Sequence, residues 1–208
     1  MTRIPRRHLF GLIALSGLAA GGGAAAQSLP AAVPIQGLND ALLQIMRAGK
    51  KVPFAERARI AEPAIVAAFD LPQILKTSVG SRWEAIPMQQ QIELSEVFRR
   101  YTVASYVANF DGFSGEKFVI LPQTRSVGTD LVVETQIVGS DGSPTRIDYQ
   151  MRHGSAGWKS VDVLLDGSIS RVAVQRSDFR SLVKSADATA LIASLRSKVA
   201  ALEGGGKS

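Results

Sequence analysis

The chain has 208 residues, of which 46% are hydrophobic, 20% are charged and none is cysteine, a composition typical of a folded globular protein. The lack of cysteine excludes disulfide frameworks, thiol nucleophiles and zinc sites built on thiolates, and the two histidines are too few for a histidine-rich metal centre. The formal net charge of +6 is compatible with an anionic membrane surface. We therefore expect a binding protein without a metal or cofactor.

Residues 1–26 have the order of an export signal. Arginines come first, an apolar stretch begins at Leu9, and small residues follow up to Ala26. This order is typical of a secretory signal, and we predict cleavage after Ala26. The adjacent Arg6 and Arg7 also fit a twin-arginine signal, and retention of the segment as an anchor is left open. Its removal lowers the formal charge from +6 to +3, because it holds three arginines and no acidic residue.

Helical periodicity dominates the first half of the mature chain. We expect a flexible lead-in over residues 27–36 because this stretch is small and proline-bearing. Apolar residues then recur every three or four positions, which predicts a helix from a cap at Asn39 or Asp40 to Gly49 and helices at about 53–69, 71–80 and 87–110. Asp70 is placed to cap the third helix, and Gly80 to end it. The last helix is apolar over much of its circumference, which indicates a buried central helix.

Alternation of apolar and polar residues replaces the helical pattern after Gly115. It predicts antiparallel strands at 117–121, 131–138, 145–153 and 158–165, with Val161, Val163 and Leu165 on one face. Two helices follow at about 170–184 and 186–202, and residues 204–208 form a polar tail that we expect to be disordered. The order of elements predicts one α+β domain over residues 37–203, in which a curved antiparallel sheet wraps apolar helices.

Several stretches, taken in order, resemble the MlaC-like family of periplasmic phospholipid carriers, also called the toluene-tolerance family. They are Phe69-Asp70-Leu71, Val79-Gly80 followed by Trp83, the helix start Gln89 to Phe98, Tyr101 to Tyr106, Trp158-Lys159, Asp162-Val163 and Asp166-Gly167-Ser168. The stretch from Asn109 to Phe118, together with residues 166–170, looks closest to the HpnM branch, which is associated with hopanoid biosynthesis. The resemblance spans about residues 38–200.

The resemblance implies a sheet like that of nuclear transport factor 2, combined with a helical subdomain around an apolar cavity for acyl chains. It implies a soluble shuttle in the periplasm that carries phospholipid or a hopanoid-type lipid. Its expected partners are an inner-membrane ABC-type transport complex and an outer-membrane lipoprotein complex. Such a carrier is not an enzyme and needs no cofactor.

Apolar residues of the short third helix, the long helix and the sheet are the candidates for lipid binding. They are Leu71, Leu75, Val79, Trp83, Phe98, Tyr101, Val103, Val107, Ile147, Tyr149, Val161, Val163 and Leu165. Arg82, Arg99 and Arg100 are candidate contacts for a lipid headgroup or a partner, because guanidinium pairs well with phosphate. Apolar periodicity also fits an ordinary packed core and a solvated arginine face, and only the resemblance favours a cavity.

Two other functions are compatible with the residues. A small hydrolase or isomerase would use His153 with Asp162 or Asp148, and a Ser-His-Asp arrangement would require the histidine to reach its partners inside the cavity. His153 precedes Gly154-Ser155-Ala156-Gly157, which predicts an exposed hairpin tip and argues against this function. The third candidate is a non-carrier protein that organises membrane complexes without binding lipid.

Overall fold

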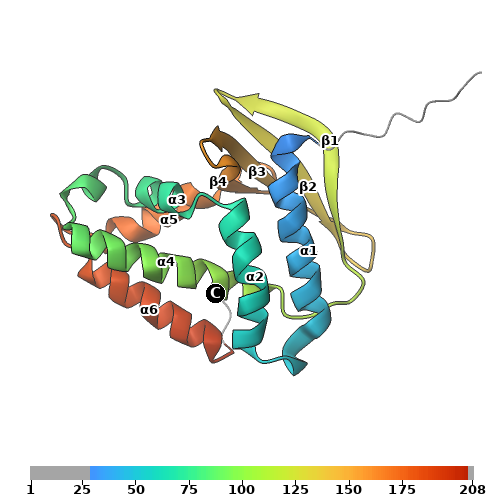
Figure 1. The fold of residues 1–208 in the computed structure, drawn as a ribbon, viewed down its shortest axis with the longest axis horizontal. Coiled ribbons are helices and arrows are strands. Elements are labelled where there is room, and N and C mark those ends of the chain that lie inside the picture. The colour runs from blue at the N-terminus through green and yellow to red at the C-terminus, as the bar shows by residue number, and fades with distance from the viewer. Residues whose placement is uncertain (1–28, 206–208) are drawn as a thin grey trace, which may run out of the picture.

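The computed structural model describes residues 29–205 and shows helices packed beside one antiparallel sheet (Figure 1). The helices are α1 (Val33–Ala48), α2 (Phe54–Ala68), α3 (Leu71–Val79), α4 (Met88–Asn109), α5 (Arg171–Arg180) and α6 (Thr189–Glu203), with short 3-10 segments at Pro30–Ala32, Gly49–Lys51 and Gly80–Ala85. The strands are β1 (Lys117–Val127), β2 (Asp130–Val138), β3 (Pro144–Gly154), β4 (Gly157–Leu165) and β5 (Ile169–Ser170), in the spatial order β1-β2-β3-β4-β5. Every neighbouring pair is antiparallel, and the predicted α+β fold with a curved sheet is confirmed.

The start of the described chain differs from the expected flexible lead-in. Residues 30–32 form a 3-10 helix, and α1 begins directly after it at Val33. The predicted cap at Asn39 or Asp40 is therefore wrong, because both residues lie inside α1. Pro30 and Pro34 occupy first-turn positions, where the missing amide hydrogen costs no hydrogen bond. The small side chains of Ala31 and Ala32 are buried, and the segment contacts β2 and β4. The predicted export signal lies outside the described residues.

The corner between α2 and α3 fixes the helices against the sheet. Asp70 caps α3 as predicted, since its Oδ1 accepts a hydrogen bond from the backbone N–H of Gln73 at 3.1 Å. The backbone N–H of Asp70 donates to the carbonyl oxygen of Ser160 in β4 at 2.9 Å. Gly80 ends α3 with φ +74°, a left-handed conformation that favours glycine. Phe69 and Leu71 are thereby held over the sheet.

The register of β3 and β4 decides which side chains share the inner face of the sheet. Ile147 pairs with Leu165, and Tyr149 pairs with Val163, so these four side chains point to the same face. The register then shifts by one residue and leaves Val161 as an extra residue in β4. The prediction that Val161 shares a face with Val163 and Leu165 is therefore wrong, because a bulge interrupts the alternation.

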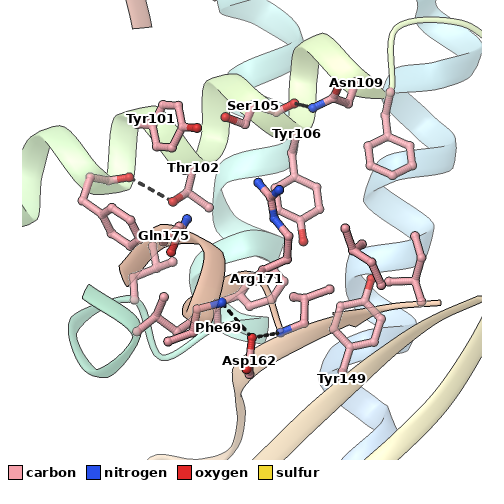
Figure 2. Close-up of a pocket in the computed structure, with 18 residues that line it drawn as sticks. Phe69, Tyr101, Thr102, Ser105, Tyr106, Asn109, Tyr149, Asp162, Arg171 and Gln175 are labelled. Carbon is pink, nitrogen blue, oxygen red and sulfur yellow. Dashed lines mark hydrogen bonds between the residues drawn. The ribbon is translucent and has the colours of Figure 1, made fainter. Parts of the chain in front are cut away.

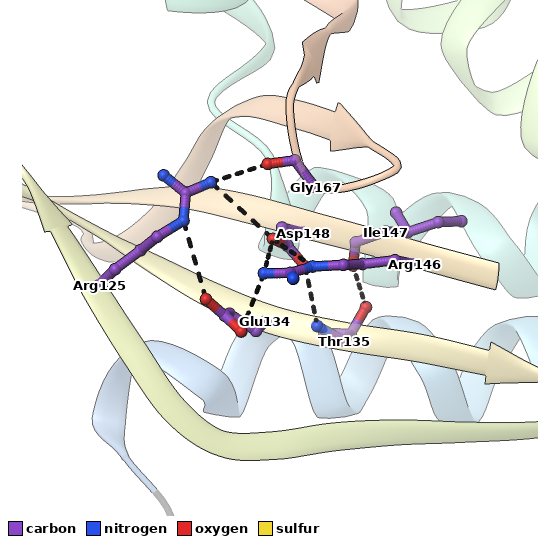
Figure 3. Close-up of polar contacts among 7 residues, drawn as sticks. All are labelled: Arg125, Glu134, Thr135, Arg146, Ile147, Asp148 and Gly167. Atoms are coloured by element: carbon purple, nitrogen blue, oxygen red, sulfur yellow. Dashed lines mark hydrogen bonds and ion pairs between the residues drawn. The ribbon is translucent and has the colours of Figure 1, made fainter. Parts of the chain in front are cut away.

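The outer face of the sheet carries a network of ion pairs centred on Asp148 (Figure 3). The guanidinium of Arg146 donates to both Asp148 oxygens at 2.8–3.1 Å, and Arg125 donates to the carbonyl oxygen of Gly167 at 2.9 Å. Gly167 has φ +74°, and a Cβ at this position would lie 2.7 Å from Nε of Arg146. The Asp166-Gly167-Ser168 turn therefore needs glycine both for its conformation and for this close approach.

A second ion pair on the outer face makes stability depend on pH. Arg152 donates to Asp130 at 2.7 and 2.8 Å, and Gln150 donates at 2.7 Å. The hydrogen bond from Arg152, supported by that from Gln150, lowers the pKa of Asp130. A carboxyl whose pKa is lower when folded stabilises the protein above its unfolded pKa of about 3.9, and this contribution is lost as pH falls through the folded value.

We predict that Asp130→Asn lowers the urea midpoint of unfolding at pH 7 and that its difference from the wild type shrinks below about pH 3.5. Urea titrations of both proteins at pH 7 and below about pH 3.5 measure this difference. An equal loss at both values would contradict the assigned role of the carboxylate charge.

Candidate functional site

A cavity of about 350 Å³ lies between the inner face of the sheet, α3, the second half of α4 and the start of α5 (Figure 2). Small-molecule sites usually enclose about 300–1,000 Å³. The wall is formed by Phe69, Leu71, Ile74, Phe98, Tyr101, Thr102, Ser105, Tyr106, Asn109, Phe110, Ile147, Tyr149, Asp162, Val163, Leu165, Arg171, Val172 and Gln175. The cavity therefore has the size of a ligand site and a wall drawn from elements far apart in the sequence.

Where α4 faces the sheet, the wall combines aromatic and aliphatic side chains with hydroxyls and one amide. Positions 98, 101, 102, 105, 106 and 109 of α4 recur every three or four residues, which places them along one side of the helix. Ile147, Tyr149, Val163 and Leu165 oppose them from the sheet. The ring of Phe69 lies beside the rings of both Tyr106 and Tyr149, with centroids 5.6 and 6.1 Å apart. Aromatic contacts therefore connect the two walls.

Asp162 fixes the N-terminus of α5 at the cavity. Its Oδ1 accepts hydrogen bonds from the backbone N–H groups of Val163 at 2.8 Å and Val172 at 3.0 Å, and its Oδ2 accepts one from the hydroxyl of Ser170. Ser170 in turn caps α5 by accepting from the N–H of Ala173 at 2.9 Å. The carboxylate thus serves the local fold and determines where Arg171 lies.

Arg171 is the cationic residue of the cavity wall, and its side chain is exposed. Within residues 29–205 it makes no ion pair. Burial raises the pKa of Tyr106, and the positive charge of Arg171 opposes part of that rise. Burial also raises the pKa of Tyr149, so both phenols remain protonated at neutral pH. The site combines an exposed cation with an interior of rings, aliphatic groups and hydroxyls.

A comparison with known families now bears on this arrangement. A family model described as "MlaC protein" matches residues 36–197. The chain belongs to the MlaC family. The narrower HpnM assignment stays a prediction.

One solved structure shares the MlaC fold of this chain with a TM-score of 0.71. It is a phospholipid-binding protein from Ralstonia solanacearum in complex with a phospholipid, and the two sequences are 19% identical. The match covers 84% of this chain and 99% of the other. No curated protein sequence matches the chain.

The structure of this MlaC protein divides the candidate lipid-binding residues into two groups. Leu71, Phe98, Tyr101, Ile147, Tyr149, Val163 and Leu165 line the cavity. Leu75, Val79, Trp83, Val103, Val107 and Val161 do not. The core contains four of them, namely Leu75, Val79, Val103 and Val107, and Trp83 packs against this core. The bulge in β4 moves Val161 out of the alternation that places Val163 and Leu165 at the cavity. Lipid contact by the first group stays a prediction.

The three candidate headgroup arginines lie elsewhere and have other partners. Arg82 donates to the carbonyl oxygens of Arg180 and Val183, which joins the segment after α3 to the end of α5. Arg99 forms ion pairs with Glu62 and Glu96, and Arg100 lies 3.5 Å from Glu203. None of the three lines the cavity, because each side chain reaches a partner on another helix or at the end of one.

The residues of the enzymatic alternative are not brought together. His153 is exposed near the end of β3, where its ring meets Trp158 edge-on at 5.2 Å. Asp162 is bound to the start of α5, and Asp148 lies in the network on the outer face of the sheet. Among residues 29–205 no group of three or more His, Asp or Glu side chains is arranged to hold a metal ion. No helix in the same range is long and apolar enough to span a bilayer.

Several wall residues were absent from the sequence-based candidates. Thr102, Ser105, Tyr106 and Asn109 continue the same side of α4 as Phe98 and Tyr101, so helical spacing from those two residues points to them. Phe69 belongs to a stretch that carried the family resemblance. Arg171 had no comparable signal, because the hydrogen bonds of Asp162 and Ser170 determine where α5 begins.

Proposed function

We propose that this MlaC-family protein is a periplasmic lipid carrier that binds phospholipid acyl chains in the cavity between α4 and the sheet. It moves lipid between the inner and outer membranes as the soluble component of an ABC-type transport system, and it is not an enzyme. The export-type order of residues 1–26 supports the periplasmic location. The phospholipid bound by the Ralstonia solanacearum protein, which has the same fold, supports the ligand class.

The single observation that carries the proposal is the cavity itself. Transfer of an acyl chain from a bilayer into water costs about 0.8 kcal/mol per methylene, or roughly 12 kcal/mol for about sixteen carbons. A soluble shuttle must offset most of this cost with an apolar interior. If a methylene occupies about the volume of a water molecule, about 30 Å³, a cavity of 350 Å³ accommodates most of one chain.

The first experiment identifies the ligand directly. Protein recovered from the periplasmic fraction of a lipid-replete host is purified gently and analysed by native mass spectrometry, and its lipid is then extracted for mass analysis. The proposal expects a reproducible adduct with the mass of a phospholipid. A hopanoid adduct would favour the HpnM branch, and bare protein would favour a non-carrier organiser of membrane complexes.

We predict that Arg171→Gln weakens phospholipid binding by about three- to fivefold, because an exposed ion pair contributes up to about 1 kcal/mol. Binding of diacylglycerol, which lacks the phosphate, should not change. Displacement of a fluorescent lipid by each compound measures both affinities. Arg59→Gln serves as the matched control, since Arg59 is also exposed but lies on α2, which does not line the cavity. An equal loss for both lipids would contradict the phosphate contact.

A further inference from the structure

Four of the five hydroxyl groups in the wall of the cavity lack hydrogen-bond partners within residues 29–205. Tyr101, Tyr106 and Tyr149 make no side-chain hydrogen bond there, and the Oγ of Ser105 is buried without a partner. By contrast, the hydroxyl of Thr102 in the same wall donates to the carbonyl oxygen of Phe98 at 2.9 Å. Unpartnered hydroxyls are therefore a feature of the cavity wall, and those of Tyr106 and Tyr149 come from α4 and from the sheet.

The two phenols face the cavity from opposite walls. Tyr106 comes from α4 and Tyr149 from β3, and Figure 2 shows both hydroxyls directed into the space between these elements. Tyr149 is only 4% exposed. Phe69 lies beside both rings, and Phe110 stacks on Tyr106 with centroids 5.9 Å apart. The rings are therefore held in place, so the hydroxyls cannot easily turn away to find other partners.

Displacement of water by an entering lipid makes these hydroxyls favour lipids that carry hydrogen-bond acceptors. Water can bond to them while the cavity is empty, but an entering acyl chain removes that water and offers no acceptor in return. A buried hydroxyl without a hydrogen bond costs free energy, whereas one that finds an acceptor recovers it. A bound lipid therefore gains affinity if it carries acceptors within hydrogen-bond distance of these hydroxyls.

The wall carries three kinds of group. Arg171 is exposed, and its charge acts on the hydroxyl of Tyr106, which lies near Tyr149. Aliphatic side chains of Ile74, Ile147 and Leu165 complete the wall. A diacyl glycerophospholipid has three matching kinds of group, namely an anionic phosphate, two ester carbonyls and hydrocarbon chains.

We propose that Tyr106 and Tyr149, with Ser105, donate hydrogen bonds to the ester carbonyl groups of a glycerophospholipid. The inference rests on the proposed carrier function and narrows its ligand class to lipids with ester-linked chains. Hydrocarbon-like polycyclic lipids and ether lipids lack these carbonyl acceptors and bind less tightly.

A pair of lipids that differ only in their carbonyls tests the inference. Dipalmitoyl phosphatidylglycerol and its dihexadecyl ether analogue share the headgroup and the chain length. Each lipid is titrated against the full-length mature protein by displacement of a fluorescent lipid. The wild type should prefer the ester by about three- to tenfold for each carbonyl that is bonded, and Tyr106→Phe/Tyr149→Phe should bring the ratio of the two affinities close to one.

The control variant is Ser95→Ala, which removes a hydroxyl from the part of α4 that lies outside the cavity and should keep the ester preference. Circular dichroism checks that each variant is folded. Equal affinities in the wild type, or a preference that survives in the double variant, would overturn the inference while leaving the carrier function intact. If neither lipid binds, the carrier function fails as well.

Discussion

Val163→Asp should abolish lipid loading. Val163 lies on the inner face of the sheet, pairs with Tyr149 and lines the cavity. An aspartate there places a carboxylate where acyl chains are expected, and burial of a polar group without a hydrogen bond costs about 2 kcal/mol or more. Lipid affinity should therefore fall at least about thirtyfold, and native mass spectrometry of the purified variant should show protein without a lipid adduct.

The matched control is Val119→Asp, because Val119 is exposed on the edge strand β1, where a charge is well tolerated. Val163→Trp provides a second variant that keeps the wall apolar but fills the cavity, and it should also lose the adduct. Thermal unfolding verifies that both variants at position 163 are folded. A folded Val163→Asp protein that still extracts labelled lipid normally would show that the lipid lies elsewhere.

The elements of the fold could be predicted because their signals are local. Asp70 and Gly80 mark the ends of α3 by capping and by a left-handed conformation, and both effects depend on residues within one helical turn. The alternating pattern likewise located β2, β3 and β4 to within a few residues. The bulge at Val161 could not be found in this way, because it is defined by the pairing of β4 with β3.

The position of the cavity could be predicted only in part. Val107 and Tyr101 belong to the same long apolar helix, yet Val107 is fully buried in the core and Tyr101 faces the cavity. Hydrophobicity requires only that both side chains leave water, so it does not separate a packed neighbour from an empty volume. The polar part of the wall depends on Arg171, whose place is determined by Asp162 through tertiary hydrogen bonds.

The network on the outer face of the sheet connects stability with the site. Asp148 is 0% exposed and accepts hydrogen bonds from Arg146 and from the backbone N–H of Thr135 (Figure 3). Arg125 reaches the same carboxylate at 3.9 Å and also donates to Gly167. Gly167 belongs to the turn that leads into β5 and α5. Asp148 therefore helps to hold the turn from which Arg171 is positioned.

Asp148→Ala should lower the free energy of unfolding by about 3 kcal/mol. The substitution removes the buried one of the two carboxylates that Arg125 and Arg146 share, the other being that of Glu134, and loss of one partner of a buried pair costs about 3–5 kcal/mol. The lower end applies because the Arg146 side chain is 40% exposed and keeps Glu134 as a partner at 2.9 Å. For a domain of this size the melting temperature should fall by roughly 10 °C, which urea titration and calorimetry can measure.

The double variant Arg146→Met/Asp148→Leu distinguishes the charge from the packing. Replacement of both members of an ion pair by apolar residues of similar volume is often close to neutral, so the double variant should recover most of the lost stability. Arg125 retains Glu134 at 3.8 Å as a partner in that background. If Asp148→Ala costs less than about 1 kcal/mol, or if the double variant is no more stable than the single one, the network does not stabilise the sheet through its buried charge. Because the turn at Gly167 leads to α5, Asp148→Ala should also weaken the contribution of Arg171 to phospholipid binding. The double variant should weaken it less if Arg125 keeps its hydrogen bond to the carbonyl oxygen of Gly167.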